Sequence, residues 1–374
     1  MRTRLIPSGE RGAALALTLI ALVVVGALVG GSFLIALLDR RSGETALRAA
    51  QALGAAEAGL DQAMTAWRAT NHASMTVGAT RSLGAGTLTG GASHSDTLTR
   101  LGGTLFLLRS VGKSRVGSVF ARAQVARFIR LDPAGLDGKA AVATLEGAAV
   151  GGSSRVDGAD SLPLGWGLLC PPPDTIGVAG IRDSMGSVTF SGSCSGGSCV
   201  SGHPPVQPDS TLGGLALTQL GAQSFAGLFA AADVTVGGVV TGVAPRVAGS
   251  VCEQSDSLNW GEPLPTAGHP CRNYFPVIAA QGGTVLGSGR GQGLLLVNGD
   301  LEVSGGFEFF GPMVILGTLN GSGAGGRLSG AVLARRVMLS DHTEVRFSRC
   351  AVSRALAGSA RPRPIRERSW SRLY

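Results

Sequence analysis

The residue types that most often carry out chemistry are thinly spread along this sequence. Most of the histidines lie in stretches rich in serine, proline and glycine, where exposed loops are expected; the five are His72, His94, His203, His269 and His342. Neither the G-x-S-x-G pattern of a serine hydrolase nor the H-E-x-x-H pattern of a zinc protease occurs. We therefore expect no catalytic residue, no metal site and no cofactor.

Two close pairs of carboxylates are the remaining candidates for acid catalysis or Ca²⁺ binding, Asp157 with Asp160 and Asp300 with Glu302. Solvated turn carboxylates explain such pairs more simply. Polysaccharide lyases and hydrolases built on β-helices need Asp, Arg and Lys clustered along one face. The strands expected here are almost purely apolar, with glycine turns between them. The sequence therefore predicts a protein that is not an enzyme.

The six cysteines indicate disulfides more strongly than metal binding. Cys194 and Cys199 bracket Ser-Gly-Gly-Ser, Cys252 and Cys271 bracket a proline-rich loop, and Cys170 and Cys350 remain. No paired C-x-x-C spacing typical of a zinc site is present. An even number of cysteines predicts up to three disulfides in an oxidising compartment, although six cysteines allow fifteen pairings. Cys194–Cys199 and Cys252–Cys271 are the pairs we expect first.

Composition predicts short strands joined by glycine turns. The chain has 374 residues, of which 59 are Gly, and only 15% are charged. Its net charge of +8 comes from arginines that flank an apolar stretch and from six arginines near the C-terminus, Arg354, Arg361, Arg363, Arg366, Arg368 and Arg372. No basic face with interleaved aromatic residues occurs, so we expect no specific nucleic-acid partner.

The N-terminal region predicts a membrane-spanning helix. No charged residue occurs from Ala13 to Leu38, a length of about 39 Å as a helix, which exceeds the ~30 Å hydrocarbon core of a bilayer. Arg2, Arg4 and Arg11 precede it, which favours a cytoplasmic N-terminus and export of the remainder. The apolar stretch is too long for a secretory signal peptide. An alanine-rich pattern then continues the helix to about Trp67.

The start of this helix resembles the class III leader of type IV prepilins. The resemblance rests on Glu10-Arg11-Gly12-Ala13-Ala14-Leu15 followed by an unbroken apolar helix. A second run, Ala55-Ala56-Glu57-Ala58-Gly59-Leu60-Asp61-Gln62-Ala63, is similar to a segment of PilX-type minor pilins. The resemblance thus extends from the N-terminus to about Thr65. Major pilins carry Glu at the fifth mature position, where this chain has Leu17, which favours a minor or tip component.

The resemblance implies a set of sites and partners. A prepilin peptidase would cut between Gly12 and Ala13, and the partners would be other pilins and the inner-membrane pilus assembly platform. Gly26 and Gly30 form a G-x-x-x-G pattern that permits close helix packing, and Glu57 is a third candidate for helix packing. The implied location is the bacterial inner membrane, single-pass, with the bulk of the chain periplasmic or in a surface pilus.

The clearest internal repeat lies near the C-terminus. Three segments that begin at Gly293, Gly311 and Gly330 align without gaps, and the second interval is one residue longer than the first. Each has a short apolar strand and a turn, with Leu301, Leu319 and Met338 at its ninth position. Units of this kind predict a β-solenoid in which these three side chains form one inward ladder. An antiparallel sandwich with coincidental spacing is the alternative.

These patterns predict an α+β fold, a long N-terminal transmembrane and amphipathic helix followed by an all-β, glycine-rich exported domain of the β-solenoid type. The expected segments are a leader at 1–12, a transmembrane helix at 13–38, its exported continuation at 39–69, a linker at 70–96, a β-hairpin at 97–131, a β domain at 132–353 with its clearest coils at 293–348, and an Arg-rich tail at 354–374. A lateral or capping helix is expected over Leu212–Ala232.

The function that the sequence predicts is that of a minor pilin-like structural subunit of type IV pilus assembly. It would pack through its N-terminal helix and present the exported β domain. Two alternatives remain. One is the tip pseudopilin of type II secretion, which shares the helix. The other is a membrane-anchored β-solenoid that binds glycan or cell wall.

Overall fold

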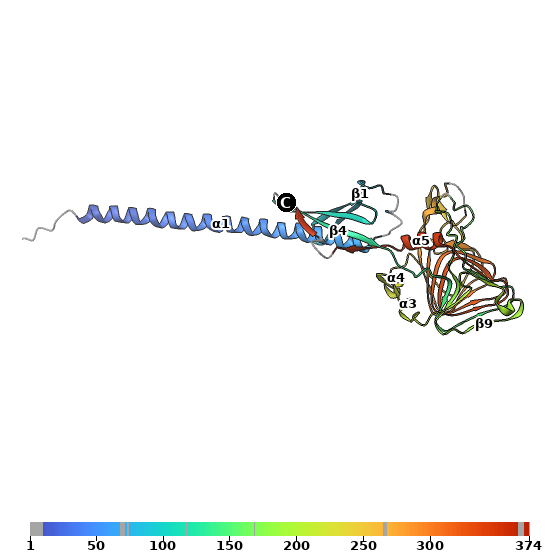
Figure 1. The fold of residues 1–374 in the computed structure, drawn as a ribbon. Helices are drawn as coiled ribbons and strands as arrows, with labels where there is room; N and C mark the ends of the chain where they lie inside the picture. Colours follow the sequence, from blue (N-terminus) through green and yellow to red (C-terminus); the bar gives the residue numbers. More distant parts are fainter. Residues whose placement is uncertain are drawn as a thin grey trace, which may run out of the picture. The chain divides into compact units, whose positions relative to one another are not determined.

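The computed structural model describes residues 10–67, 72, 75–116, 119–167, 169–264, 268–365 and 370–373. The chain forms two compact units. The helix–sheet unit takes in Met1–Ala66, Val77–Ile129 and Pro364–Tyr374, and the coil unit takes in Trp67–Thr76 and Arg130–Arg363. A long apolar helix followed by mostly β structure is the α+β arrangement that the sequence predicts. Figure 1 shows both parts.

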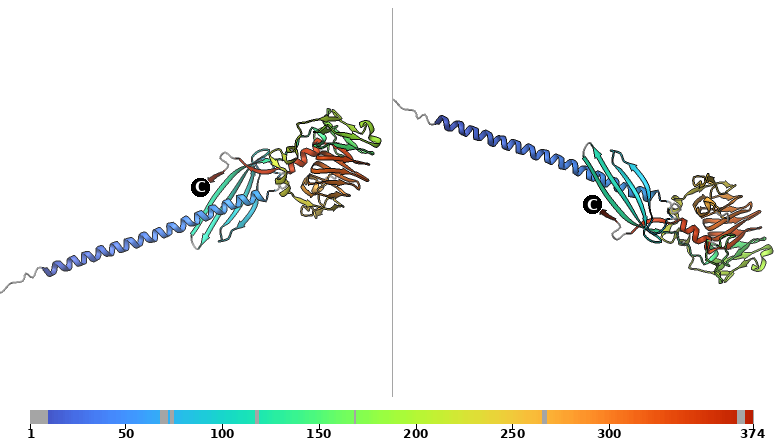
Figure 2. Two further views of the ribbon diagram at one scale, coloured as in Figure 1. Left: turned by 90° about the horizontal axis from the view of Figure 1, so that it is seen from below. Right: turned by 90° about the horizontal axis from the view of Figure 1, so that it is seen from above.

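One helix, α1 (Glu10–Thr65), accounts for most of the N-terminal part of the helix–sheet unit. It has no proline, so every backbone N–H beyond its first turn can donate to the carbonyl four residues earlier. Its end at Thr65 lies two residues before the predicted end at Trp67. Figure 2 shows α1 running without a break onto the sheet of the same unit.

Most of a six-stranded sheet belongs to this unit, with the order β1-β2-β3-β4-β26 and with β27 also paired to β4. The last residues of β4 and the first three of β26 are counted with the coil unit. The first four strands form an antiparallel meander, and the bounds are β1 (Thr80–Thr87), β2 (Ser93–Arg100), β3 (Leu105–Val116), β4 (Val119–Asp132), β26 (Arg361–Pro364) and β27 (Trp370–Leu373). The sequence predicts a hairpin over 97–131. β3 and β4 occupy most of this segment, but residues 97–100 belong to β2.

Residues 70–96, interpreted from the sequence as a linker, hold β1 and the start of β2 instead. The side chains of β2 alternate between buried and half-buried, but two of the three that are buried are polar, His94 and Asp96, with Leu98 as the third. A period of two in hydrophobicity therefore cannot be seen in the sequence of this strand. For the same reason the serine- and threonine-rich composition resembled that of a loop.

The coil unit is built on a 17-stranded sheet whose pairings are all parallel. The strands are β5 (Ala140–Thr144), β6 (Ala148–Val150), β7 (Arg155–Asp157), β8 (Ala179–Asp183), β9 (Val188–Phe190), β10 (Val200–Ser201), β11 (Val206–Pro208), β14 (Val234–Val236), β15 (Val239–Val240), β18 (Val277–Gln281), β19 (Thr284–Leu286), β20 (Arg290–Gln292), β21 (Leu294–Asn298), β22 (Leu301–Val303), β23 (Phe307–Gly321), β24 (Gly326–Leu339) and β25 (Glu344–Phe347). Parallel pairing contradicts the alternative of an antiparallel sandwich.

The three glycines that define the repeat lie above one another. Gly311 pairs with Gly330, and a Cβ on Gly311 would lie 2.0 Å from the carbonyl oxygen of Gly293. A Cβ on Gly330 would lie 2.1 Å from the carbonyl oxygen of Gly311. All three have positive φ angles, of 130°, 145° and 158°. Only glycine fits at these positions, because neighbouring backbones approach each other too closely for a side chain.

The predicted ladder is correct for two of its three members. Leu301 pairs with Leu319, but Leu319 pairs with Val337, and Met338 is 44% exposed. The register of β23 against β24 shifts by one between Ile315 and Thr318, where β23 contains a bulge. A slip of this size moves a side chain to the opposite face of the sheet, which is why Val337 replaces Met338 inside.

The strands do not stack in the order of the sequence. β24, near the C-terminus, pairs with β5, and β8 and β11 follow outward from β5. On the other side of β24 lie β23, β21, β18 and β14 in turn. Figure 2 shows the result, with the green strands of residues 140–208 beside the orange-red strands of the C-terminal coils. The first strands of the unit thus lie next to strands from near its end.

Short helices complete the coil unit. The lateral helix predicted over Leu212–Ala232 is divided into α3 (Leu215–Thr218) and α4 (Phe225–Ala230). Between them a hairpin of β12 (Gln219–Leu220) and β13 (Gln223–Ser224) turns at Gly221, where φ is +63°. α5 (Arg349–Gly358) packs against β23 and β24. The predicted tail at 354–374 therefore includes half of α5 as well as β26 and β27.

All six cysteines are paired. The structure joins Cys194 to Cys199 and Cys252 to Cys271, the two pairs expected first, and Cys170 to Cys350. The third pair links cysteines 180 positions apart and attaches α5 to the loop after β7. The smaller strands and helices β16 (Val247–Ala248), β17 (Val251–Cys252), η1 (Gly192–Gly197) and η2 (Pro270–Asn273) surround the two shorter bridges.

Candidate assembly interface

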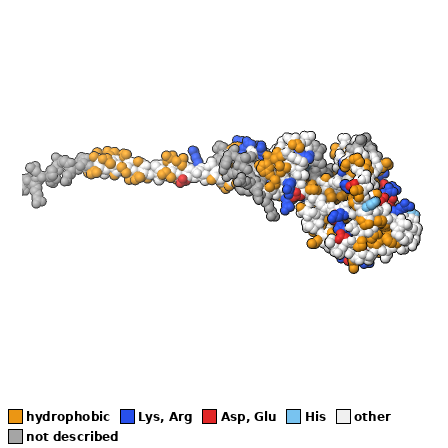
Figure 3. All heavy atoms as spheres, in the orientation of Figure 1, with side chains coloured by type: hydrophobic (Ala, Val, Ile, Leu, Met, Phe, Trp, Pro, Cys, Tyr) orange, Lys and Arg blue, Asp and Glu red, His pale blue; other side chains and the backbone are white. Residues whose placement is uncertain are grey.

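The N-terminal half of α1 is an apolar surface that nothing in the described part of the chain covers. Its large aliphatic and aromatic side chains between Leu15 and Leu38 keep 43% to 73% of their area exposed. α1 contains a segment that is long and apolar enough to cross a membrane, with a mean hydropathy of 2.6. Figure 3 shows the hydrophobic side chains along this half of the helix. Such an area is stable only in lipid or against other apolar surfaces.

The C-terminal half of α1 is docked on the sheet of its own unit. Ala52, Ala55, Ala56 and Leu60 have no exposed area, and they lie on one face of the helix, toward β2 and β3. This face has mostly small side chains, which bring the helix backbone close to the strands.

Gly112 of β3 shows how close the helix and the sheet approach. A Cβ at this position would lie 1.9 Å from the carbonyl oxygen of Ala52 and 2.7 Å from the backbone nitrogen of Ala56. Ser114, two positions further along β3, donates a hydrogen bond of 2.9 Å to Gln51 of α1. The helix is therefore held by a glycine contact with its backbone and by a hydrogen bond beside that contact.

A polar cluster lies beneath Gly59 of α1. His94 Nδ1 is 2.9 Å from Asp96 Oδ2, and Ser110 of β3 lies opposite Asp96. A Cβ on Gly59 would come within 2.6 Å of all three side chains. Asp96 Oδ1 and Ser110 Oγ are buried and have no hydrogen-bond partner among the described residues. His94 thus lies on a buried strand and not in the exposed loop that the sequence suggested.

The candidates for helix packing all lie on free surface. A Cβ added at Gly26 or Gly30 would meet nothing within 4 Å, and Glu57 is exposed on the docked half of α1. These three positions therefore remain available to a partner. Of the predicted leader, residues 1–9 lie outside the described residues, whereas Gly12 and Ala13 belong to α1.

A row of alternating charges runs across neighbouring strands of the coil unit, and sequence reasoning missed it. Strand pairing places these residues side by side in the order Arg290, Glu308, Arg327, Glu344 and Arg155. Arg327 donates to Glu308 at 3.1 Å and to Glu344 at 3.2 Å. The expectation that the strands lack charges along one face is therefore wrong. The sequence does contain a pattern that could have predicted this row, because Arg290, Glu308 and Arg327 each lie three positions before a repeat glycine.

The two carboxylate pairs singled out from the sequence hold turns together. Asp157 accepts from Ser201 Oγ at 2.8 Å, and Asp160 accepts from the backbone N–H of Asp174 and of Arg349. Asp300 accepts from the N–H of Thr318, and Glu302 from Ser322 Oγ. No group of three or more metal-ligating side chains is found where the structure is described.

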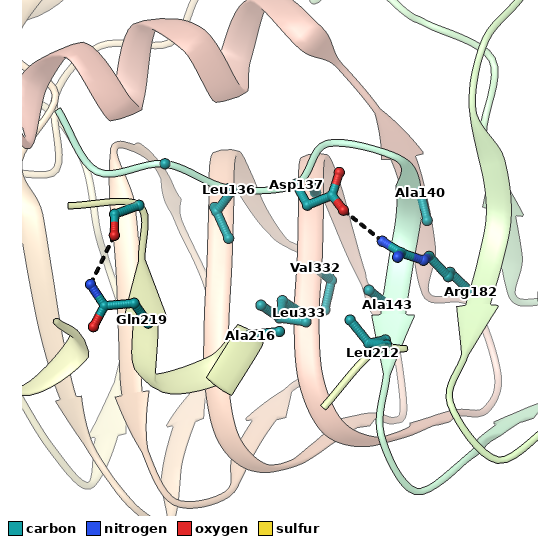
Figure 4. A pocket seen from close by; sticks show the side chains of 13 residues that line it. Leu136, Asp137, Ala140, Ala143, Arg182, Leu212, Ala216, Gln219, Val332 and Leu333 are labelled. Carbon is teal, nitrogen blue, oxygen red and sulfur yellow. Dashed lines mark hydrogen bonds and ion pairs between the residues drawn. The ribbon is translucent and has the colours of Figure 1, made fainter. Parts of the chain in front are cut away.

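A cavity of about 310 Å³ lies beside β5 and β24, lined mainly by Leu136, Ala143, Leu212 and Leu333 (Figure 4). At its edge the largely buried guanidinium of Arg182 donates to Asp137 at 2.9 Å and to Asp209 at 2.5 Å. Two hydrogen bonds from Thr211, together with that from Arg182, lower the pKa of Asp209 to about 2. Arg182 thus links β8 to two loops, a structural role.

Three of the C-terminal arginines also have structural contacts. The guanidinium of Arg354 lies 5.0 Å from the ring centre of Phe275 and 5.9 Å from that of Trp166, and it donates to Asn273. Burial lowers its pKa, and Arg272 contributes to this shift. Arg361 donates to the carbonyl oxygen of Ala231, and Arg363 pairs with Asp132 at 3.6 Å. These side chains are part of the fold and not of a free basic tail.

The chain has little detectable similarity to known proteins. No protein-family model and no curated protein matches it. Among solved structures, the crystal structure of the competence-associated pilin ComZ from Thermus thermophilus is similar at a TM-score of 0.23 and 14% identity. The match covers 87% of this chain and 97% of ComZ. At this score the similarity supports no structural or functional argument.

Proposed function

We propose that this protein is a PilX-like minor pilin, a structural subunit of type IV pilus assembly. The observation that carries the proposal is the division of α1 into two halves. One half is apolar on all sides and exposed, and the other is docked on an antiparallel sheet through Ala52, Ala56 and Leu60. A subunit that must leave the bilayer and pack into a fibre needs both, because the exposed half exchanges lipid for neighbouring helices while the docked half holds the exported units.

The positions left free along α1 support the same proposal. Gly26 and Gly30 allow another helix to approach closely, and Glu57 can form an ion pair with a neighbouring subunit. The partners in this account are other pilins, the inner-membrane assembly platform and a prepilin peptidase that cuts between Gly12 and Ala13. The protein would be single-pass in the inner membrane, with a cytoplasmic N-terminus. Neither a cofactor nor an enzymatic step forms part of the proposal.

In this account the coil unit is a β-solenoid that the pilin helix carries outside the cytoplasm. Parallel pairing, repeat glycines above one another and the inward ladder of Leu301, Leu319 and Val337 support this interpretation. The three disulfides support an oxidising compartment for this unit.

Photo-cross-linking in the native host tests the assembly role. A photoreactive residue at Leu22, which is 73% exposed, is compared with one at Leu60, which has no exposed area. We expect Leu22 to cross-link to proteins whose N-termini carry a prepilin leader, identified by mass spectrometry, and Leu60 to give only adducts within the chain. Adducts at Leu22 to lipid alone, in cells that assemble pili, would contradict the proposal and favour a static membrane anchor.

A further inference from the structure

A polar cavity of about 570 Å³ opens on the coil unit at the end of the charged row, where β7, β10 and β25 meet η1. Its volume lies within the roughly 300–1,000 Å³ range of small-molecule sites. Its wall comes from segments that are far apart in the sequence, around residues 152–157, 193–201 and 344–346. The non-sequential stacking of β7 on β25 brings these segments together.

Each charged side chain in the wall, with one exception, has an ion pair or a hydrogen bond with another described residue. Glu344 accepts from Arg346 at 2.7 Å and from Arg327 at 3.2 Å. Asp157 accepts from Ser201 Oγ and from the N–H of Ala159. Arg155 is exposed, and its guanidinium has neither an ion pair nor a hydrogen bond with any residue that the structure describes. The wall therefore offers one guanidinium whose donors are available to a ligand.

Serine hydroxyls form much of the remaining wall. Five serines line the cavity, among them Ser153, Ser154 and Ser198. Ser154 is 1% exposed, and its Oγ has no hydrogen-bond partner among the described residues. Each hydroxyl can donate one hydrogen bond and accept two, as can the hydroxyls of a sugar.

The wall chemistry argues against two other kinds of ligand. The carboxylates of Asp157 and Glu344 would repel a densely charged phosphodiester chain. A hydrophobic peptide would find no exposed large apolar side chain among the described residues of the wall, because Val156 is 1% exposed and Cys199 is in a disulfide. A ligand with one negative charge and many hydroxyls meets neither obstacle.

We propose that this cavity binds a carboxylated sugar, such as a uronic acid residue of an acidic polysaccharide. The sugar carboxylate binds the guanidinium of Arg155, whose planar fork matches a carboxylate in a bidentate manner. The ring hydroxyls bind the serine hydroxyls of the wall. This site lies on the coil unit alone and does not depend on how α1 assembles.

Titration of the full-length protein in detergent tests this proposal, with galacturonic acid as the probe, which has one carboxylate, and galactose, which has a hydroxymethyl group in its place, as the neutral control. EDTA in the buffer excludes calcium bridging. Arg155→Gln is compared with Arg336→Gln, which removes the same charge from β24 at a residue that does not line the cavity. We expect galacturonic acid to bind at least tenfold more tightly than galactose. We expect Arg155→Gln to weaken the binding of galacturonic acid at least tenfold and Arg336→Gln to leave it unchanged.

Several results would overturn the proposal. The first is the absence of binding at millimolar galacturonic acid, and the second is equal binding of galactose. The third is an equal loss of affinity in the two variants, which would indicate that bulk charge attracts the ligand. A single-stranded oligonucleotide that displaces galacturonic acid and loses its own affinity in Arg155→Gln would identify the cavity as a nucleic-acid site instead.

Discussion

The two units hold their sheets in place by different means. In the helix–sheet unit, one helix covers the sheet and the contact depends on small residues, with Gly112 beneath Ala52 and Gly59 above a polar cluster. In the coil unit, parallel strands enclose an interior of aliphatic and aromatic side chains, among them Leu301, Phe307 and Leu319. The first arrangement depends on the distance between two backbones, and the second depends on buried apolar area. Substitutions should therefore act on the two units through different physical terms.

The largest effect is expected from a charge placed in the interior of the coil unit. Leu319→Asp would bury a carboxylate between Leu301 and Val337 with no partner, at a cost of several kcal/mol, comparable to the whole stability of a domain. Met338→Asp is the matched control, because Met338 is 44% exposed and surface changes are usually within about 0.5 kcal/mol.

The measurement is the thermal transition of the coil unit in the purified full-length protein. We expect the transition to be lost or strongly lowered in Leu319→Asp and nearly unchanged in Met338→Asp. A larger loss in Met338→Asp than in Leu319→Asp would contradict the observed register. It would show that β23 and β24 pair without a bulge, with Met338 inside and opposite Leu319.

A smaller loss of stability, of about 1–3 kcal/mol, is expected when a larger side chain is placed between α1 and the sheet. Gly112→Val places a side chain where the carbonyl oxygen of Ala52 would be 1.9 Å from its Cβ, so α1 must shift away from β3. Gly103→Val is the control, since a Cβ there meets nothing within 4 Å. Limited proteolysis of α1 between Ala50 and Leu60 should be faster in Gly112→Val only. Equal rates in the two variants would show that the glycine contact does not hold the helix.

The repeat in the coil unit could be read from the sequence because one residue type recurs at the same place in each coil. Gly293, Gly311 and Gly330 are required wherever one coil crosses another, so the spacing of the coils is visible in the sequence. The bulge in β23 could not be predicted from the glycine spacing, because it lies inside the strand, between Ile315 and Thr318, where Asp300 accepts a hydrogen bond from the N–H of Thr318. The non-sequential order of the strands leaves no local pattern at all.

The helix–sheet unit was predicted in its long helix and in β3 and β4, but not in β1 and β2. The long helix, β3 and β4 could be predicted because long apolar or alternating stretches indicate a helix or a strand without any knowledge of tertiary contacts. β2 has His94 and Asp96 on its buried face, where the two side chains bind each other beneath Gly59, so the buried positions of this strand are not apolar in the sequence. The candidate interface along α1 followed from composition. The cavity at Arg155 did not, because its wall joins β7 to β25, which lie near opposite ends of the coil unit's sequence.

The smallest effect on stability is expected at the edge of the coil unit, where charged groups and their hydrogen bonds, and not apolar packing, stabilise the fold. Hydrogen bonds from Thr211 and then from Arg182 hold the pKa of Asp209 at about 2, below its ordinary value of 3.8. A lowered pKa of a carboxyl group in the folded state stabilises the fold above the ordinary value, and this stabilisation is lost as the pH falls from about 4 to about 2. Asp209→Asn should therefore reduce stability at pH 6 and make little difference at pH 2.

Denaturant unfolding of both proteins across this pH range gives the comparison. Thr211→Val, which removes the hydroxyl of the main hydrogen-bond donor to Asp209, should show a partial loss in the same window. If the free energies of unfolding of the original protein and of Asp209→Asn differed by the same amount from pH 6 to pH 2, ionisation of Asp209 would not contribute to stability.

The N-terminal sequence of the mature protein from its native host tests the central claim most directly. A leader with Arg2, Arg4 and Arg11 would oppose lateral packing of the apolar half of α1, because moving even one charge through the bilayer centre costs at least a few kcal/mol. A pilin subunit must therefore lose this leader, whereas in a static anchor the same arginines would hold the orientation. We predict an N-terminus at Ala13 that requires the host's prepilin peptidase and is abolished by Gly12→Val. An intact Met1 in mature, exported protein would contradict the account.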